Sequence, residues 1–257
     1  MGQVRLWSHE AKRALVTTTP AWLTYYVGGS YRKATEIALR YVTANASKIS
    51  LLKTDLWNEA IETRRDILGQ YEKNEKFRLY GVDLSPIVCR RAQTRLSKTY
   101  VVQGDITNLP FRDESFDVVL DLSVLDHVPA SQVPAVIAEY ARLEKRGSIV
   151  LLIYWYRSGM WKLTNALLRY KSGNNPTPRE VTQYYHDRNL VSDEMRKHYD
   201  IIKEFYILTQ IVLPTDILQK KLPIRFYSFV TEFEYSRVSR YLLRDFGALH
   251  AIVGRKR

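Results

Sequence analysis

The stretch from Gly104 to His127, GDITNLPFRDESFDVVLDLSVLDH, constrains the fold of this chain more than any other segment. It follows the apolar run Tyr100–Gln103 and contains a second apolar run, Val118–Leu122, after a polar connection that includes Pro110. Short apolar runs separated by turn residues predict two buried strands. Polar side chains follow each run directly, and in open parallel sheets ligands bind beyond the carboxyl ends of the strands. The stretch therefore predicts a ligand site at this edge of a sheet.

Strand and helix patterns alternate along the rest of the chain. Further apolar runs predict strands at 49–54, 77–82 and 148–155, and closing strands at 204–213 and 249–253. Helical spacing predicts helices at 30–42, 58–71 and 131–144, and another that begins at Pro86 with Ser85 as its cap. This alternation predicts an α/β fold with a doubly wound, mostly parallel sheet.

The central stretch resembles the middle of the class I S-adenosylmethionine-dependent methyltransferases, which carry the pattern G-D-x-x-x-L-P-F-x-D-x-S-F-D-x-V. The positions that match are Gly104, Asp105, Leu109, Pro110, Phe111, Asp113, Ser115, Phe116, Asp117 and Val119. The resemblance covers residues 48–155 well and 200–257 loosely. It implies a Rossmann-like seven-stranded sheet with an antiparallel carboxyl-terminal strand and S-adenosylmethionine as cofactor. The implied reaction is methyl transfer to an oxygen or nitrogen of a small or medium-sized acceptor, which could be acidic or glycosidic.

We expect one methyltransferase domain over residues 48–257, preceded by a helical extension over residues 1–47. Residues 156–200 are too long for a simple connection and rich in aromatic and basic side chains. We interpret them as a cap insertion over the site, where aromatic rings would stack on the acceptor and Lys or Arg would pair with its acid group. The alternative is ordinary packing beneath a solvated face.

Several residues are candidates for holding the cofactor. Asp83 ends the second predicted strand, where an acidic residue accepts hydrogen bonds from ribose hydroxyls in dinucleotide-binding folds; the alternative is a simple turn residue. The resemblance implies that Leu84 covers the adenine and that Asp105 and Ile106 meet its edge. Ser123 follows the fourth strand and is expected to face the methyl group.

The first predicted loop departs from the family, most of whose members carry D-x-G-x-G-x-G so that bare backbone can approach the cofactor. Trp57 and Glu59 stand at the first two glycine positions when the motif is aligned on Asp55. We expect Lys53, Asp55, Asn58 and Glu59 to form a substitute site, with Asp55 near the cofactor's ammonium. The alternative is a degenerate loop that binds nothing, which would make the chain a catalytically silent binding protein.

The catalytic candidates are Asp126 and His127. An attacking oxygen or nitrogen must lose a proton, and histidine takes protons near neutral pH. The alternative for His127 is a packing role beside the methionine portion of the cofactor. Methyl transfer asks mainly for alignment of the reacting atoms, so catalysis does not require a base.

The positive net charge is also compatible with a second function, methylation of nucleic acid. The formal net charge of +12 attracts anions, including nucleic acid, and Tyr, Lys and Arg are interleaved. An RNA or DNA methyltransferase is therefore the alternative. It is not favoured, because basic residues are spread along the whole chain and no N-P-P-Y-type motif is present.

Other sequence features bear on disulfides, metal binding and cellular location. Cys89 is the single cysteine, which excludes an intramolecular disulfide and a cysteine metal cluster and suits a reducing cytoplasm. The histidines lack metal-ligand spacing, so no metal site is expected. The amino terminus lacks the apolar core of a signal peptide, and no apolar run approaches the ~20 residues of a membrane-spanning helix.

Overall fold

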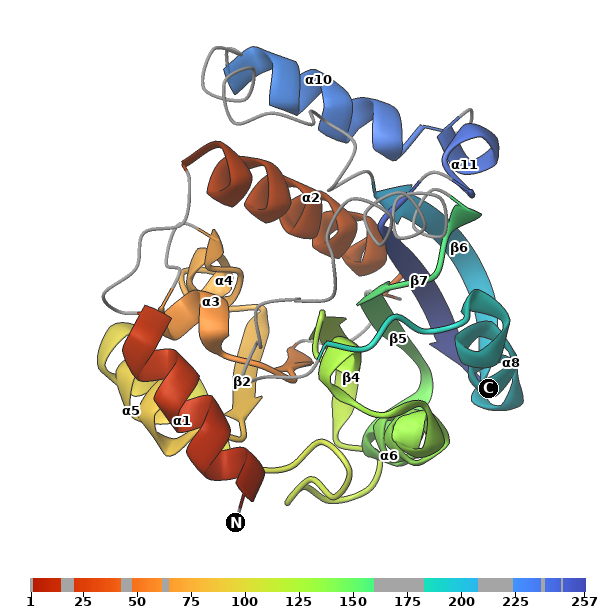
Figure 1. The fold of residues 1–257 in the computed structure, drawn as a ribbon. Helices are drawn as coiled ribbons and strands as arrows, with labels where there is room; N and C mark the ends of the chain where they lie inside the picture. Colours follow the sequence, from red (N-terminus) through yellow and green to blue (C-terminus); the bar gives the residue numbers. More distant parts are fainter. Residues whose placement is uncertain are drawn as a thin grey trace.

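The structure, a computed structural model, describes residues 2–14, 21–42, 48–61, 65–159, 183–207, 224–236, 239–245 and 247–257. A seven-stranded sheet with the order β3-β2-β1-β4-β5-β7-β6 forms its centre (Figure 1). The strands are β1 (Ile49–Lys53), β2 (Phe77–Asp83), β3 (Thr99–Gln103), β4 (Phe116–Leu122), β5 (Glu144–Trp155), β6 (Tyr199–Ile207) and β7 (Leu249–Lys256). The first five strands pair in parallel, and β7 is antiparallel to both β5 and β6. The predicted Rossmann-like, doubly wound sheet with an antiparallel carboxyl-terminal strand is confirmed.

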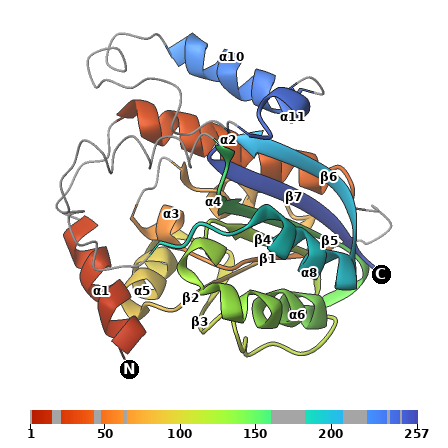
Figure 2. The same cartoon turned by 45° about the vertical axis from the view of Figure 1, so that its right-hand side comes forward.

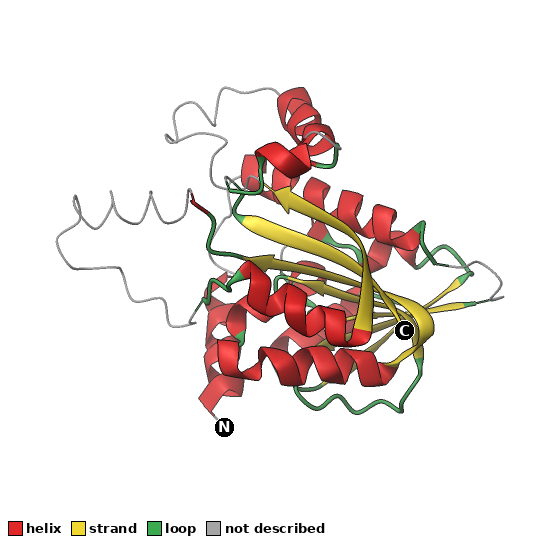
Figure 3. Cartoon of the chain, turned by 90° about the vertical axis from the view of Figure 1, so that its right-hand side faces the viewer, coloured by secondary structure: helices red, strands yellow, loops and turns green. Residues whose placement is uncertain are grey.

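Helices cover both faces of this sheet, as Figures 2 and 3 show. One face carries α2 (Ala21–Leu39), α4 (Leu68–Tyr71) and α5 (Pro86–Arg95), and the other carries α6 (Val133–Leu143) and α8 (Arg188–His198). The remaining helices are α1 (Gly2–Ala14), α3 (Trp57–Ala60), α10 (Ile224–Glu234) and α11 (Ser239–Leu242), with two 3-10 turns at Leu125–His127 and Ala130–Gln132.

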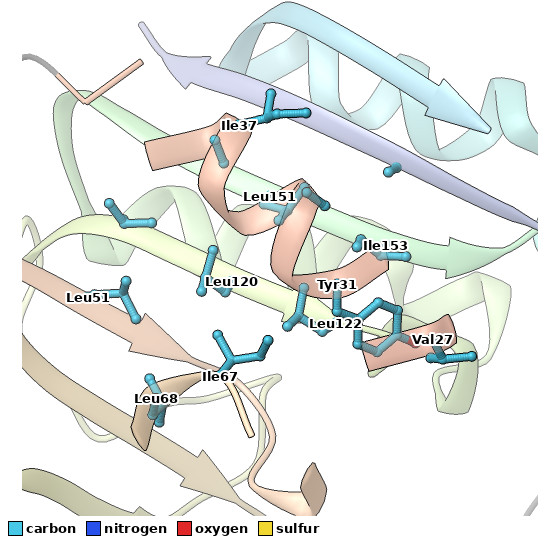
Figure 4. Close-up of a cluster of buried hydrophobic side chains, with 14 of the residues drawn as sticks. Val27, Tyr31, Ile37, Leu51, Ile67, Leu68, Leu120, Leu122, Leu151 and Ile153 are labelled. Carbon is cyan, nitrogen blue, oxygen red and sulfur yellow. The ribbon is translucent and has the colours of Figure 1, made fainter. Parts of the chain in front are cut away.

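Neighbouring residues of the central strands enter different cores. Leu151 on β5 packs toward α2, in the cluster drawn in Figure 4, whereas Leu152 packs toward α6. Both side chains are fully buried. Successive side chains of a strand point to opposite faces, so a parallel sheet covered on both faces needs continuous apolar runs. The strand predictions succeeded because these runs are unbroken.

The helix near the amino terminus is longer than its sequence pattern predicts. The expected helix at 30–42 begins instead at Ala21, and it contains Gly28 and Gly29, a pair of residues that is typical of turns. A Cβ atom at Gly28 would come within 3.2 Å of the Arg65 side chain, so this glycine permits close packing within the helix rather than a turn. Tertiary packing outweighs the low helical propensity of glycine here.

The predicted helix at 58–71 is divided into α3 and α4, with residues 66 and 67 outside any helix. The buried Glu59 carboxylate explains the interruption, because its Oε1 accepts hydrogen bonds from the backbone amides of Ile67 (3.2 Å) and Leu68 (3.3 Å). A side chain thus takes over the role of capping the second short helix.

Helices α2 and α10, which are far apart in the sequence, lie side by side. In Figure 1, α10 lies along α2. The fully buried Glu234 of α10 accepts hydrogen bonds from the hydroxyls of Tyr26 and Ser30 on α2. Residues of α2 also belong to the same buried cluster as strands β1, β4 and β5, so this helix shares a core with the expected 48–257 domain.

The expected cap at 156–200 is described only at residues 156–159 and 183–200. Within it, α8 packs on α6 and contributes Val191 and Met195 to the second core. This helix covers the sheet rather than the ligand edge. Strand β6 begins at Tyr199, earlier than expected, and the part of the predicted 204–213 strand beyond Ile207 lies outside the described residues.

Candidate functional site

A cavity of about 730 Å³ opens at the carboxyl ends of β1, β2 and β4. Its size lies within the range of small-molecule and cofactor sites. Most of the residues that the sequence singled out line it together: Asp55, Asn58, Asp83, Leu84, Asp105, Ile106, Ser123 and His127. Three others, Lys53, Glu59 and Asp126, lie outside its lining and are fully or almost fully buried.

Asp83, at the end of β2, binds the backbone that follows both β1 and β2. Its Oδ1 accepts a hydrogen bond from the backbone amide of Ser85 at 2.8 Å, and its Oδ2 accepts one from that of Leu56 at 3.0 Å. Burial raises the pKa of this carboxyl to about 6, against the opposing effect of the two amides. Each carboxylate oxygen has two lone-pair sites, so both can still accept a ligand hydroxyl.

Asp105 presents a more open carboxylate at the end of β3. Its Oδ1 accepts hydrogen bonds from the backbone amide (2.9 Å) and the hydroxyl (2.8 Å) of Thr107, and the residue is exposed. Both contacts use one oxygen, which leaves Oδ2 for a ligand. Leu84 and Ile106 add apolar wall on the same side of the cavity.

A buried ion cluster holds the loop that lacks glycines. The Nζ of Lys53 donates to the backbone oxygen of Asp55 (2.9 Å), to its Oδ2 (2.8 Å) and to Oε2 of Glu59 (3.0 Å). Burial disfavours the ammonium charge of Lys53, but the two carboxylates outweigh it and raise its pKa. For Glu59, burial raises the pKa of the carboxyl, and the Lys53 ammonium opposes this. Lys53 and Glu59 thus support the loop from behind, while Asp55 and Asn58 reach the cavity.

The turn after β4 is fixed by Asp121, which the sequence analysis did not select. Its Oδ1 accepts hydrogen bonds from the backbone amides of Val124 (2.8 Å) and Leu125 (3.3 Å), and its Oδ2 accepts one from the Tyr140 hydroxyl at 2.9 Å. Ser123 within this turn has a φ of 71°, a left-handed conformation that few residues other than glycine adopt. Such strain persists where surrounding contacts enforce it, and it is frequent at ligand sites.

Tyr31 of α2 is a further cavity residue that the sequence analysis treated only as part of a helix. Its hydroxyl lies 2.5 Å from the Ser123 Oγ, and Figure 4 shows its ring beside Leu122. Burial raises the pKa of this phenol above its usual range, so the hydroxyl keeps its proton. Only tertiary structure brings it to the end of β4.

The catalytic candidates have different surroundings. Asp126 is fully buried, and its Oδ1 accepts a hydrogen bond from the Trp155 amide at 2.5 Å. His127 lines the cavity, and the Trp7 ring packs edge-on against it with 4.6 Å between ring centroids. The amino-terminal helix α1 thus forms one wall, to which it also contributes Gln3, Glu10 and Arg13.

Trp7 also contacts Trp57, with 6.0 Å between ring centroids and an angle of 73° between the rings. Trp57 therefore fills space at a position where most family members have glycine. Among the described residues, no cluster of His, Cys, Asp and Glu has the arrangement of a metal site. None of the helices in the described ranges is long and apolar enough to cross a membrane.

Part of the chain is similar to known methyltransferases. Residues 67–152 match a family model described as a methyltransferase domain. An uncharacterized methyltransferase of Synechocystis sp. is 31% identical over 81 residues, which are 32% of this chain and 38% of that protein. The chain spans about a third of the length of the curated relatives it matches.

Two solved structures share the fold at low identity. A SAM-dependent methyltransferase from Methanosarcina mazei has a TM-score of 0.57 and 15% identity, covering 86% of this chain and 96% of its own. Geranyl diphosphate C-methyltransferase from Streptomyces coelicolor A3(2) has a TM-score of 0.55 and 14% identity, covering 88% and 78%. Its strand order and these structural neighbours show that the chain has the fold of S-adenosylmethionine-dependent methyltransferases, and residues 67–152 match a methyltransferase-domain model.

Proposed function

We propose that this protein is an S-adenosylmethionine-dependent methyltransferase that acts on an oxygen or nitrogen of a small or medium-sized acceptor. One observation carries the proposal. The cavity at the carboxyl edge of the sheet is lined by the carboxylates of Asp55, Asp83 and Asp105 together with the apolar side chains of Leu84 and Ile106. This is the edge at which α/β sheets bind ligands.

The residues present fit the cofactor. Asp83, at the end of β2, would accept hydrogen bonds from the ribose hydroxyls, and Leu84 and Ile106 would enclose the adenine. The Oδ2 of Asp105 would accept from the exocyclic amine. Asp55 lies at the end of β1, on the far side of Asp83 from β3, and would receive the ammonium of the amino acid portion. When bound, the cofactor supplies a methyl group on a positively charged sulfur.

The remaining task of the chain is alignment. The β4 turn, held by Asp121, presents Ser123 and His127 to the cavity, and Tyr31 of α2 lies beside Ser123. The Trp7 ring of α1 packs edge-on against His127. Orientation of the reacting atoms contributes much of the rate of a displacement of this kind.

A small-molecule acceptor suits this geometry better than a nucleic acid. Trp7 and Arg13 of α1 and Trp57 of α3 line the cavity, and they supply aromatic rings and a positive charge for a small acceptor. The structural neighbour from Streptomyces coelicolor methylates geranyl diphosphate, a small anion, by its name. An acidic or glycosidic acceptor remains the proposed class.

Transfer of a labelled methyl group tests the function. The protein is incubated with S-adenosylmethionine labelled in its methyl group and with a cell extract separated into small molecules, protein and nucleic acid. We expect the label in the small-molecule fraction, and its loss with Asp83→Ala. Label in RNA or DNA would support the alternative, a nucleic-acid methyltransferase. Label in no fraction at saturating cofactor would contradict the proposal that the protein is an enzyme.

The loop without glycines makes a separate prediction. Asp55→Asn should weaken S-adenosylmethionine binding about tenfold or more, because it removes the carboxylate that contacts both the ammonium and Lys53. Trp57→Gly should bring no gain, since the backbone is already arranged around the Lys53 cluster and glycine adds ordering entropy. Calorimetric titration of both variants measures this. Tighter binding by Trp57→Gly, with no change for Asp55→Asn, would show a decayed family loop.

A further inference from the structure

The amino acid portion of S-adenosylmethionine carries an ammonium and a carboxylate, and each charge needs a partner when it leaves water. Asp55 is the proposed partner of the ammonium. The cofactor's carboxylate would enter a cavity that the carboxylates of Asp55, Asp83 and Asp105 already line. Like charges repel more strongly in a partly enclosed site than in water, so tight binding needs a cation near Asp55.

The backbone that directly follows Asp55 is occupied by other contacts. The Leu56 amide donates to Oδ2 of Asp83 at 3.0 Å, and the Trp57 amide donates to Oδ1 of Asp55 at 3.2 Å. A backbone amide has a single hydrogen to donate, so the protein's own carboxylates use both of these donors. This favours a side chain as the partner of the cofactor's carboxylate.

Two arginines, Arg13 and Arg65, are among the described residues that line the cavity. Arg13 comes from α1, pairs with Glu10 at 3.1 Å and has a side chain that is 54% exposed. Arg65 is partly buried and lies between α3 and α4, the two short helices that follow Asp55. Its position in the chain makes Arg65 the better candidate for a cation beside Asp55.

Gly28 of α2 allows Arg65 to lie against this helix near Tyr31. A Cβ atom at Gly28 would come within 3.2 Å of the Arg65 Cγ and 3.4 Å of its Cα. Gly28 and Tyr31 are three residues apart on a helix, so they share a face. Burial raises the pKa of the Tyr31 phenol, and among the smaller influences the Arg65 guanidinium lowers it while the Asp55 carboxylate raises it. Opposite charges therefore meet at this wall of the cavity.

We propose that Arg65, which packs against α2 where Gly28 has no side chain, binds the carboxylate of the amino acid portion of S-adenosylmethionine, while Asp55 binds its ammonium. This inference rests on the proposed function. A guanidinium suits the role because it can donate two parallel hydrogen bonds to one carboxylate. Together the two side chains complement a zwitterion at a loop that lacks the family's glycines.

Decarboxylated S-adenosylmethionine tests this assignment, since it keeps the sulfonium and the ammonium but lacks the carboxylate. Calorimetric titrations are run with both ligands at pH 7.5. The wild type should bind S-adenosylmethionine about tenfold or more tightly than the decarboxylated form, because only the former makes the charged hydrogen bonds. Arg65→Met should bring the ratio of the two affinities close to one by weakening S-adenosylmethionine alone. Arg65→Lys keeps the charge without the paired donors and should give an intermediate ratio.

A pair of alanine substitutions in α2 tests the role of the glycine. Gly28→Ala should weaken S-adenosylmethionine several-fold and leave the decarboxylated form nearly unchanged, because the new methyl group pushes on Arg65. Gly29→Ala is the matched control, with the same gain in helix propensity. The nearest atom to its new Cβ is Thr231 Oγ1 at 3.8 Å, an ordinary contact, so it should bind both ligands like the wild type.

The possible results distinguish this inference from the proposed function. If the wild type binds both ligands equally, or if Arg65→Met keeps the preference or weakens both ligands by the same factor, Arg65 does not bind the carboxylate and the cofactor site stands. If neither ligand binds the wild type, both proposals are wrong. Should circular dichroism show that Arg65→Met does not fold, Arg65→Lys and the comparison of Gly28→Ala with Gly29→Ala decide the matter.

Discussion

Replacing Lys53 with methionine should lower the free energy of unfolding by about 3–5 kcal/mol, the cost of leaving buried charges without their partner. The Lys53 side chain has no exposed surface, and it neutralises both Asp55 and Glu59 at 2.8 and 3.0 Å. Methionine keeps the apolar length of the side chain, so the loss reports the missing ammonium rather than a cavity. Urea unfolding of the two proteins measures the difference.

A matched control is Lys145→Met. Lys145 pairs with Asp117 at a similar distance, 2.9 Å, but its side chain is 43% exposed. An exposed pair contributes less than about 1 kcal/mol. Adding Glu59→Gln to Lys53→Met should recover part of the loss, because one of the two stranded carboxylates is then neutral. If Lys53→Met cost no more than Lys145→Met, the buried cluster would not hold this loop.

The second large effect should appear as a dependence of stability on pH. Glu144, at the start of β5, is fully buried, accepts a hydrogen bond from the Tyr199 hydroxyl, and has an Oε1 with no described partner. Burial raises the pKa of this carboxyl from 4.5 to about 8. In the unfolded chain it ionises first, so its favourable contribution is complete below pH 4.5 and is lost as the pH rises to about 8.

Glu144→Gln should remove this dependence. Relative to the variant, the wild-type free energy of unfolding should fall by up to about 1.4 kcal/mol for each pH unit between the two pKa values, and stay level above pH 8. Glu232→Gln is the control, since that side chain is 65% exposed and should give a nearly constant difference. Equal slopes for wild type and Glu144→Gln would show that Glu144 is ionised in the folded protein.

Much of the fold was predictable because one sequence signal, the continuous apolar run of a buried strand, occurs several times. The central parallel strands β1, β4 and β5 send side chains into both cores, so their apolar runs are continuous, and Asp83 and Asp105 mark two strand ends directly. The two positions belong to neighbouring strands that pair in register, and this alone places them at one edge. The ribose and adenine candidates therefore needed no tertiary information beyond the strand order.

The other side of the cavity was not predictable in this way. Trp7 and Tyr31 come from helices that precede the first strand, and no local pattern states which strand end a helix will cover. The burial of Lys53 and Glu59 was missed for a related reason: charged residues beside a strand end normally suggest exposure, and only the mutual neutralisation of the cluster allows them inside. Glu59 thereby also interrupts the helix that its sequence would continue.

Calorimetric titration with S-adenosylmethionine tests most directly whether this cavity, built without the glycine loop, is a cofactor site. The wild-type protein should bind one equivalent at pH 7.5, and Asp83→Ala should fold but bind about 1–3 kcal/mol more weakly, because the ribose hydroxyls lose an ionised acceptor. Wild-type affinity should also decline as the pH falls through about 6, where Asp83 takes up a proton. No binding to the wild type, or equal affinity in Asp83→Ala, would contradict the account.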